Sequence, residues 1–306
     1  MNTPILLIVF NRSDFFKKLI FILKKINAKK IYIKIDGPRI NNLNDKKEID
    51  KIIYIIKNIN WNCKILINKE TKNLGSRDNP VKGINWLFKS EKMGIILEDD
   101  CMPSLSFFKY CEILLNKYKN CNSISMISGR NNLEKINLDT SYYFNFGSTW
   151  GWATWRRAWK FNDPRLKNWS NKKFRQRLKK NLKDHPLFYN LLIEKCKKIF
   201  KKKINTVWDY QWLFSVISRN MIAVVPKINL VKNIGFDERS MHTKKSQFHS
   251  KINSFEIKFP LKHNNDYKIN KKLVLQEHAK LYKLSVIVFL KKCYLIFIKN
   301  VNKKYY

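Results

Sequence analysis

The chain has 306 residues, of which 44% are hydrophobic and 14% aromatic, and it carries a formal charge of +39. This composition excludes a disordered chain, and the length allows one elaborated domain or a domain with appendages. The charge favours polyanionic partners such as nucleic acid, acidic lipid or phosphorylated substrates. However, there are only 11 arginines, and lysine, asparagine and isoleucine are all abundant. Because those three residues are typical of a genome poor in G and C, part of the charge reflects codon composition.

The cysteines and the N-terminus both indicate a cytoplasmic protein. The six cysteines form no CxxC pair and show no spacing typical of zinc sites, so reduced, buried thiols are expected. The first apolar run, residues 4–10, has no basic segment before it and no small-residue cleavage site after it. We interpret it as a first strand and not as a signal peptide.

The first hundred residues alternate between strand and helix patterns. Short apolar runs predict strands, and apolar residues at helical spacing predict the helices between them. The predicted strands cover 4–10, 31–35, 63–68 and 94–98, and the helices between them begin at Ser13 or Asp14 and cover about 46–59 and 80–91. This series predicts an α/β fold with a mixed, mostly parallel central sheet flanked by helices.

Polar side chains follow each of these strands. They are Asn11 and Arg12, the turn Asp36-Gly-Pro-Arg39, the segment 73–77, and the consecutive acids Glu98, Asp99 and Asp100. Because ligands of parallel sheets bind beyond the carboxyl ends of the strands, we expect an active site there. Three adjacent carboxylates repel one another, and hard divalent cations such as Mg²⁺ or Mn²⁺ prefer such oxygens. The alternative is a solvated acidic turn. The polar clusters at the other strand ends favour an active site over this alternative.

The second half contains two aromatic segments. Residues 150–159 hold four tryptophans, which form either a substrate wall, with Trp150 or Trp152 half-exposed, or a dense corner of the core. Further on, the predicted helix over 207–214 carries Asp209 among aromatic residues. Burial can raise the pKa of such a carboxylate enough to make it a general base, whereas a helix cap is the simpler interpretation.

The last two segments carry weaker signals. The loop 233–243 holds His242, which gains interest as a metal ligand only because a metal site is already predicted nearby. Residues 246–306 form a basic extension, whose apolar runs 284–290 and 293–298 are too short to span a bilayer. They predict either an interfacial helix on an anionic membrane or a helix packed on the domain.

Together these motifs resemble those of GT-A nucleotide-sugar glycosyltransferases. Four segments carry the resemblance: Pro4–Arg12, Asp36–Arg39, Asn73–Gly75 and Ile96–Asp100. Within that class, three segments are similar to the N-acetylglucosaminyltransferase I family and its bacterial relatives: Leu97–Phe108, Trp150–Trp152 and Trp208–Trp212. The resemblance covers about residues 3–245. It predicts a GT-A domain over 1–245, with a nucleotide-sugar-binding half (1–128), an acceptor-side half (129–245) and a helical C-terminal extension.

The resemblance implies a Mn²⁺- or Mg²⁺-dependent, inverting transferase that uses a UDP-type sugar. The residues it assigns to the donor are Asn11, Arg12, Asp36, Arg77, Glu98 and Asp99, of which Asp36 would contact the nucleoside and the two arginines the base or diphosphate. Asp100 would bind the metal, with Glu98 and Asp99 holding the ribose or metal-bound water. His242 would lie near the metal and diphosphate.

On the acceptor side, the resemblance assigns the catalytic base to Asp209, with Trp150 and Trp152 forming a sugar wall. The family has two adjacent acids before a tryptophan at this point, whereas here Asp209 stands alone before Tyr210-Gln-Trp212. Asp237 and Glu238 are therefore alternative bases.

We predict that the protein transfers a hexose or N-acetylhexosamine from a nucleotide sugar to a glycan or glycolipid acceptor. The expected setting is bacterial polysaccharide or lipopolysaccharide synthesis, in the cytoplasm or on the inner face of the membrane. A basic nucleic-acid-binding protein is one alternative, but the charge is spread along the chain and no nucleic-acid-binding module is recognisable, so we expect no nucleic acid partner. A sugar nucleotidyltransferase is another, although Asn11-Arg12-Ser13 is not the glycine-rich basic loop that such an enzyme needs after its first strand.

Overall fold

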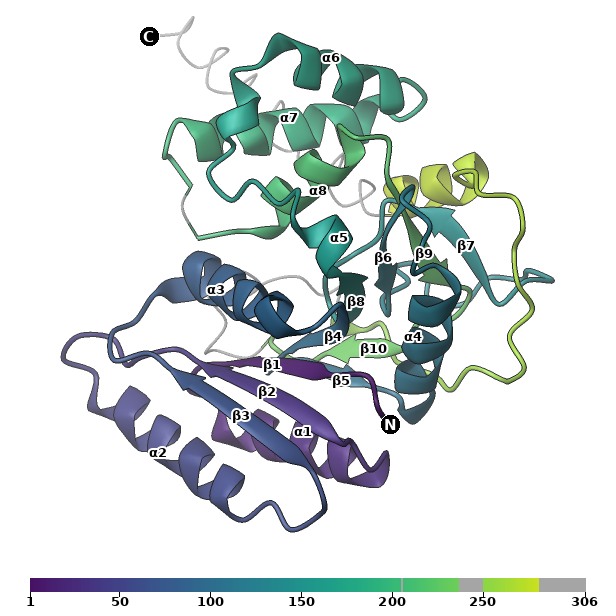
Figure 1. Ribbon diagram of the computed structural model, residues 1–306. Helices are drawn as coiled ribbons and strands as arrows, with labels where there is room; N and C mark the ends of the chain where they lie inside the picture. Colours follow the sequence, from purple (N-terminus) through teal and green to yellow (C-terminus); the bar gives the residue numbers. More distant parts are fainter. Residues whose placement is uncertain (205, 237–249, 281–306) are drawn as a thin grey trace, which may run out of the picture.

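The computed structural model describes residues 1–204, 206–236 and 250–280. Its centre is an eight-stranded mixed sheet (Figure 1). In spatial order the strands are β3 (Lys64–Lys69), β2 (Lys30–Ile35), β1 (Ile5–Val9), β4 (Met93–Glu98), β8 (Trp152–Trp155), β6 (Ile124–Ser128), β9 (Ile222–Pro226) and β7 (Tyr142–Asn145). β8 is antiparallel to both neighbours and β7 to β9, whereas the other pairs in this sheet are parallel. The predicted α/β fold with a mostly parallel sheet is confirmed.

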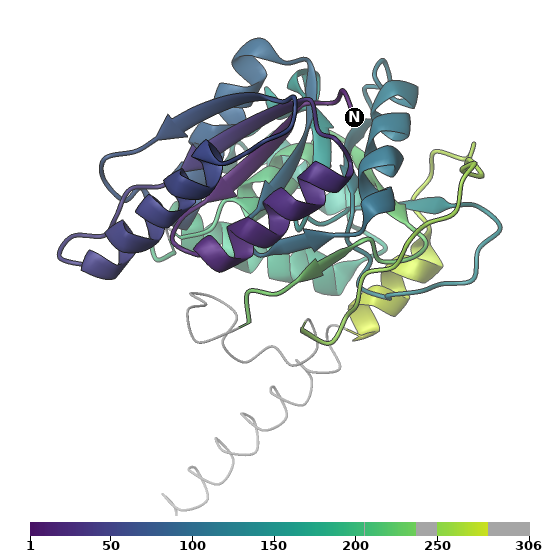
Figure 2. The ribbon, with the colours of Figure 1, turned by 90° about the horizontal axis from the view of Figure 1, so that it is seen from below.

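Helices cover both faces of this sheet. One face carries α1 (Ser13–Lys25), α2 (Leu43–Lys57) and α4 (Leu105–Lys117), and the other carries α3 (Gly75–Ser90), α5 (Arg156–Trp159), the short 3₁₀ helix η1 (Lys167–Trp169), α6 (Lys172–Asn181), α7 (Pro186–Phe200) and α8 (Asp209–Ile217). Figure 2 shows α1 and α2 together on one side. Successive strand side chains point to opposite faces, so Leu7 and Ile33 join the first layer of core whereas Leu6 and Tyr32 join the second. This two-sided burial explains why the strands read as continuous apolar runs.

A second, two-stranded sheet closes over the end of β4. It pairs β5 (Cys101–Pro103) with β10 (Val231–Asn233) in antiparallel register. Beyond this pair, the N–H of Ile234 donates a 2.9 Å hydrogen bond to the carbonyl of Asp100. The small sheet therefore brings residues 231–235 next to the acidic triplet, although more than a hundred residues separate them in sequence.

Residues 250–280 pack on the body of the domain. The N–H of Ser141 donates to the carbonyl of Lys262 (2.8 Å), and that of Asn270 donates to Phe144 (3.0 Å) on β7. A helix over 271–280 then buries Leu273 and Val274. This part of the predicted extension over 246–306 does not stand apart from the domain. The predicted membrane or packing helix at 284–298 lies outside the described residues, and none of the helices within them is long and apolar enough to cross a bilayer.

Helix α3 begins at Gly75, five residues before the predicted start at Pro80, which lies inside the helix. The cause is a carboxylate from a different strand end. Asp36 accepts hydrogen bonds from the N–H groups of Leu74 (2.8 Å) and Gly75 (2.9 Å), which satisfies donors at the start of this helix. A cap supplied from elsewhere in the chain leaves no local sequence signal.

Trp152 is a core residue, so the prediction that it forms part of an exposed sugar wall is wrong. Its side chain is 1% exposed. The ring stacks on Trp208 at 5.8 Å between centroids and lies 5.9 Å from Trp212. β8 lies between β4 and β6 in the middle of the sheet. The face to which Trp152 points is covered by α8. For this residue, the dense core corner is the correct interpretation.

Replacing Trp152 by alanine should therefore destabilise the fold by about 3–5 kcal/mol, because the cavity left in the tryptophan cluster cannot close fully. Urea denaturation measures the change. Tyr54→Ala, at a side chain that is 70% exposed on α2, is the control and should stay within about 0.5 kcal/mol of wild type. A Trp152→Ala protein as stable as wild type would contradict the core assignment.

Candidate active site

The acidic triplet lies at the carboxyl end of β4, beside the carboxyl end of β1. The two strands pair in parallel with Ile8 opposite Glu98. Arg12, at the start of α1, places one guanidinium nitrogen 3.1 Å from Asp99 Oδ1 and 3.0 Å from Asp100 Oδ2. The predicted convergence of Arg12 with the triplet is thus seen in the structure, with Arg12 paired to the acids themselves.

Acidic side chains are concentrated at this strand end. Burial, and then the charges of Asp100, Asp99 and Asp209, raise the pKa of Glu98 to about 8. Burial also raises the pKa of Asp99 to about 6, although Arg12 opposes the shift. The influence of Asp209 on Glu98 shows that these two acids, far apart in sequence, share one electrostatic environment. With Arg12 paired to two of the three adjacent acids, a cation bound at this strand end would lower the electrostatic cost of bringing them together.

A close backbone approach fixes the carboxylate of Asp100. A Cβ atom on Gly235 would lie only 2.2 Å from Asp100 Oδ2, so only glycine permits this contact. Asn233 donates to Asp100 Oδ1 at 3.3 Å and accepts from the N–H of Gly235 at 2.8 Å. The segment after β10 therefore restricts the positions that this carboxylate can adopt.

The donor set at the triplet fits a hard divalent cation. Within the described ranges, no three His, Cys, Asp or Glu side chains are arranged as a metal cluster. Magnesium and manganese sites often use only one or two protein carboxylates and complete their shell with water and substrate phosphates. In the triplet, Asp100 and Glu98 are the carboxylates that would serve as the protein ligands of such a cation. His242 and the alternative bases Asp237 and Glu238 lie outside the described residues.

Asp36 has a different role from the predicted nucleoside contact. Its side chain is 3% exposed and accepts from the N–H groups of Gly37, Leu74 and Gly75, and from the amide of Asn73. Burial raises its pKa, against the effect of these hydrogen bonds. With four donors on its two oxygens, Asp36 organises the turn at the start of α3.

Asn11 and Arg39 are held together by a buried acid that the sequence did not reveal. Asp45, fully buried on α2, accepts from the Asn11 amide (2.7 Å) and from the Arg39 guanidinium (2.7 and 2.8 Å). Arg39 also lies over the ring of Phe10, 5.5 Å from its centroid. Arg77 instead pairs with its neighbour Asp78 at 2.8 Å.

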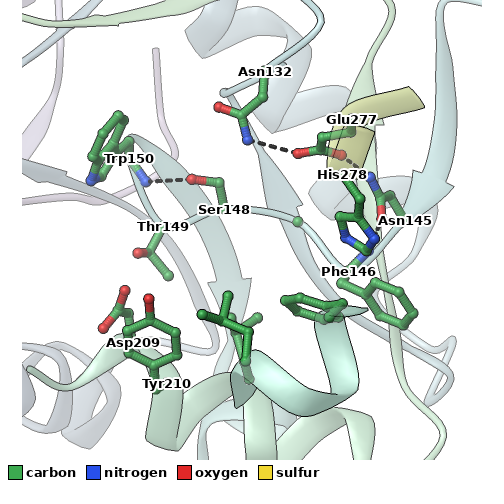
Figure 3. A pocket seen from close by; sticks show the side chains of 14 residues that line it. Asn132, Asn145, Phe146, Ser148, Thr149, Trp150, Asp209, Tyr210, Glu277 and His278 are labelled. Carbon is green, nitrogen blue, oxygen red and sulfur yellow. Dashed lines mark hydrogen bonds between the residues drawn. The ribbon is translucent and has the colours of Figure 1, made fainter. Parts of the chain in front are cut away.

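A cavity of about 370 Å³ has Asp209 as one of its lining residues (Figure 3). It is lined by the segment 145–150, by Asp209 and Tyr210 at the start of α8, and by residues of α7 and of the helix over 271–280. Trp150 lines the cavity, and its ring also contacts that of Phe236, the neighbour of Gly235, with 6.0 Å between centroids. The predicted wall residue Trp150 and predicted base Asp209 thus line one cavity.

Two further cavity residues, Glu277 and His278, come from the extension that the motifs left unassigned. Glu277 accepts hydrogen bonds from the amides of Asn132 and Asn145. Burial raises the pKa of Glu277, whereas these amides and the charge of Arg130 oppose the shift. An isolated acid in a lysine-rich tail gives no sequence signal of its own, so only the fold could identify it.

Comparison with descriptions of protein families and with curated proteins finds no match. Among solved structures, an apo UDP-glucose pyrophosphorylase aligns over 76% of this chain and 93% of its own, with 9% identity and a TM-score of 0.41. Mouse xyloside xylosyltransferase 1 aligns over 72% and 83%, with 9% identity and a TM-score of 0.34. HddC from Yersinia pseudotuberculosis, complexed with GMP-PN, aligns over 51% and 78%, with 13% identity and a TM-score of 0.32. All three scores are too low to assign an activity to this chain.

Buried His278 should make the stability of the fold depend on pH. Burial, and then the charge of His185, lower the pKa of His278 to about 4, below the ordinary value of 6.5. Protonation therefore favours the unfolded chain, so this contribution is fully present above about pH 6.5 and is lost as the pH falls toward about 4. Between about pH 7.5 and pH 5, we expect the loss to be about 2 kcal/mol.

Urea denaturation of wild type and His278→Gln at the two pH values measures this term. Other groups titrate in both proteins, so the difference between the two pH dependences isolates His278. Identical pH dependences would show that His278 is not buried in its neutral form.

Proposed function

We propose that this protein is an inverting glycosyltransferase that uses a divalent cation and a nucleotide-diphosphate sugar. The observation that carries the proposal is the placement of the acidic triplet, Arg12 and Asp209 around one edge of the sheet, with the cavity of Asp209 next to it. The triplet and Arg12 fit an anionic donor with its cation, and the cavity fits an acceptor. Both reactants would then meet beside one carboxylate.

The residues would divide the reaction between them as follows. Asp100 and Glu98 would hold Mn²⁺ or Mg²⁺, which when bound supplies Lewis-acid stabilisation of the negative charge that grows on the leaving diphosphate. Arg12 would place its guanidinium against the same charge once the donor competes with Asp99 and Asp100 for it. Arg39 over Phe10 would contact the nucleoside.

Asp209 would accept the proton of the acceptor hydroxyl as that oxygen attacks the anomeric carbon. A general base must lie within hydrogen-bond reach of the proton that it removes, and Asp209 lines the cavity where the acceptor would bind. It also begins α8, where the positive end of the helix dipole favours the carboxylate form. Attack and departure in one step on opposite faces would invert the anomeric carbon.

A sugar nucleotidyltransferase is less well supported by this site. Such an enzyme must bind a nucleoside triphosphate, which calls for a loop of backbone N–H groups or basic side chains after the first strand. The short link between β1 and α1, residues 10–12, contains no glycine and a single basic residue, Arg12.

The net charge of the protein supports a proposal for the cellular setting of the reaction. A net charge of +39 suits a protein that works at an anionic membrane surface, where each well-placed Lys or Arg contributes about 1 kcal/mol. We therefore propose a glycan or glycolipid acceptor in the synthesis of a bacterial surface polysaccharide or lipopolysaccharide, with UDP as the donor nucleotide.

Two isosteric substitutions separate donor chemistry from acceptor chemistry. Asp100→Asn should lose both the Mn²⁺-dependent hydrolysis of a UDP-sugar and transfer, because the cation site loses its charge. Asp209→Asn should keep UDP binding within about twofold and lose at least about a hundredfold in transfer, because only the base is removed. Product analysis of UDP release against sugar transfer, and isothermal titration with UDP and Mn²⁺, measure these effects.

Full transfer by Asp209→Asn would move the base to another residue. Full activity of Asp100→Asn would refute the metal site. Release of pyrophosphate by the wild-type protein when it is given UTP and a sugar 1-phosphate would assign it to the nucleotidyltransferases.

A further inference from the structure

The end of the cavity away from Asp209 is built around Glu277. Figure 3 shows Asp209 and Tyr210 on one side of the cavity and Glu277, bonded to Asn132 and Asn145, across from them. Glu277 reaches this position because the chain from 250 to 270 crosses β7 before the helix over 271–280 begins. The proposed reaction does not use this carboxylate.

Glu277 is held by a network of hydrogen bonds in which the donor and acceptor of each bond are fixed. The guanidinium of Arg130, which is 1% exposed, donates to Asn132 Oδ1 at 3.0 Å. Arginine can only donate, so this bond fixes which end of the Asn132 amide is oxygen and turns its NH₂ group toward Glu277 Oε1, 2.7 Å away. Asn145 is fixed in the same way, because its oxygen accepts from the N–H of Phe146 and its NH₂ group donates to Glu277 Oε2.

This network leaves the carboxylate able to bind a ligand. From the part of the chain that the structure describes, each oxygen of Glu277 receives one amide donor, and a carboxylate accepts about four hydrogen bonds in total. The remaining acceptor positions suit a hydroxyl pair on a neighbouring molecule. Hydroxyl-to-carboxylate bonds are short and strong when water is largely excluded.

The rest of the cavity suits a sugar ring. Phe146 and Phe188 stack on each other at 5.2 Å and present apolar surface beside Glu277, and Thr149 adds a hydroxyl on the side of Asp209. A volume of about 370 Å³ lies within the range of small-molecule sites, about 300–1,000 Å³. In such sites, a small number of polar groups at fixed positions on a partly aromatic wall orient the ligand.

We propose that Glu277, held between Asn132 and Asn145, is a specificity-determining subsite that binds hydroxyl groups of the acceptor sugar across the cavity from Asp209. The ligand class is a hexopyranoside with adjacent hydroxyls, and its identity as acceptor rests on the proposed function. Glu277 would position the acceptor so that the reacting hydroxyl meets Asp209. The C-terminal segment that the family motifs do not reach would then select the acceptor.

The test is binding of methyl hexopyranosides to the full-length protein with UDP and Mn²⁺ present, followed by ligand-observed NMR. The probes are the methyl glycosides of glucose, galactose, mannose and N-acetylglucosamine. At least one should bind wild type, and Glu277→Gln should weaken that glycoside about tenfold to a hundredfold while UDP affinity changes less than about twofold. Gln276→Ala, the exposed neighbour on the same helix, is the matched control and should bind like wild type.

Asn132→Ala provides a second variant, which carries the test if Glu277→Gln does not fold. Unchanged glycoside affinity in the folded variants would overturn the subsite. Wild type that binds UDP with Mn²⁺ but none of the glycosides would also overturn it and leave the donor site standing. A protein that binds neither UDP nor glycosides would refute the proposed function itself.

Discussion

The structure depends on the concentration of carboxylates at the carboxyl end of a buried strand. Glu98, Asp99 and Asp100 follow one another at the end of β4, and Arg12 pairs with the last two of them. Desolvation of like charges costs free energy, and proteins retain such an arrangement where a bound cation or an anionic ligand with its cation offsets it. Two neighbouring segments hold this strand end, since Arg12 at the start of α1 pairs with Asp99 and Asp100 and the segment after β10 confines Asp100 through Gly235.

Much of this arrangement could be predicted because it is local. Apolar runs with covered faces gave the strands of the first half, and parallel strands place their carboxyl ends at one edge, so Arg12 and the triplet were expected to meet. What could not be predicted depends on distant partners. Asp36 looked like a ligand contact because nothing nearby in sequence shows that it caps α3, and Trp152 looked like half of an exposed wall because its cover comes from α8. Asp45 and Glu277 carried no motif at all.

The two halves of the cavity also differ in how the chain supplies them. Asp209 and Trp150 come from segments with recognisable motifs, whereas Glu277 comes from a basic tail whose composition suggested only a surface role. A reaction centre made from motif residues and an acceptor end made from a segment outside those motifs would let one chemistry serve different acceptors. The likeness to solved structures is too distant to assign an activity, so the proposed function rests on the residues of the site.

The most direct measurement is the thermal stability of the wild-type protein with a panel of nucleotide sugars, each with and without Mn²⁺. A ligand that binds only the folded protein raises its melting temperature, by an amount set by the ratio of ligand concentration to Kd. The account predicts that at least one UDP-sugar raises the melting temperature with Mn²⁺ by more than the sugar nucleotide and the ion do separately. No shift with any UDP-, GDP- or dTDP-sugar in the presence of Mn²⁺ would contradict it.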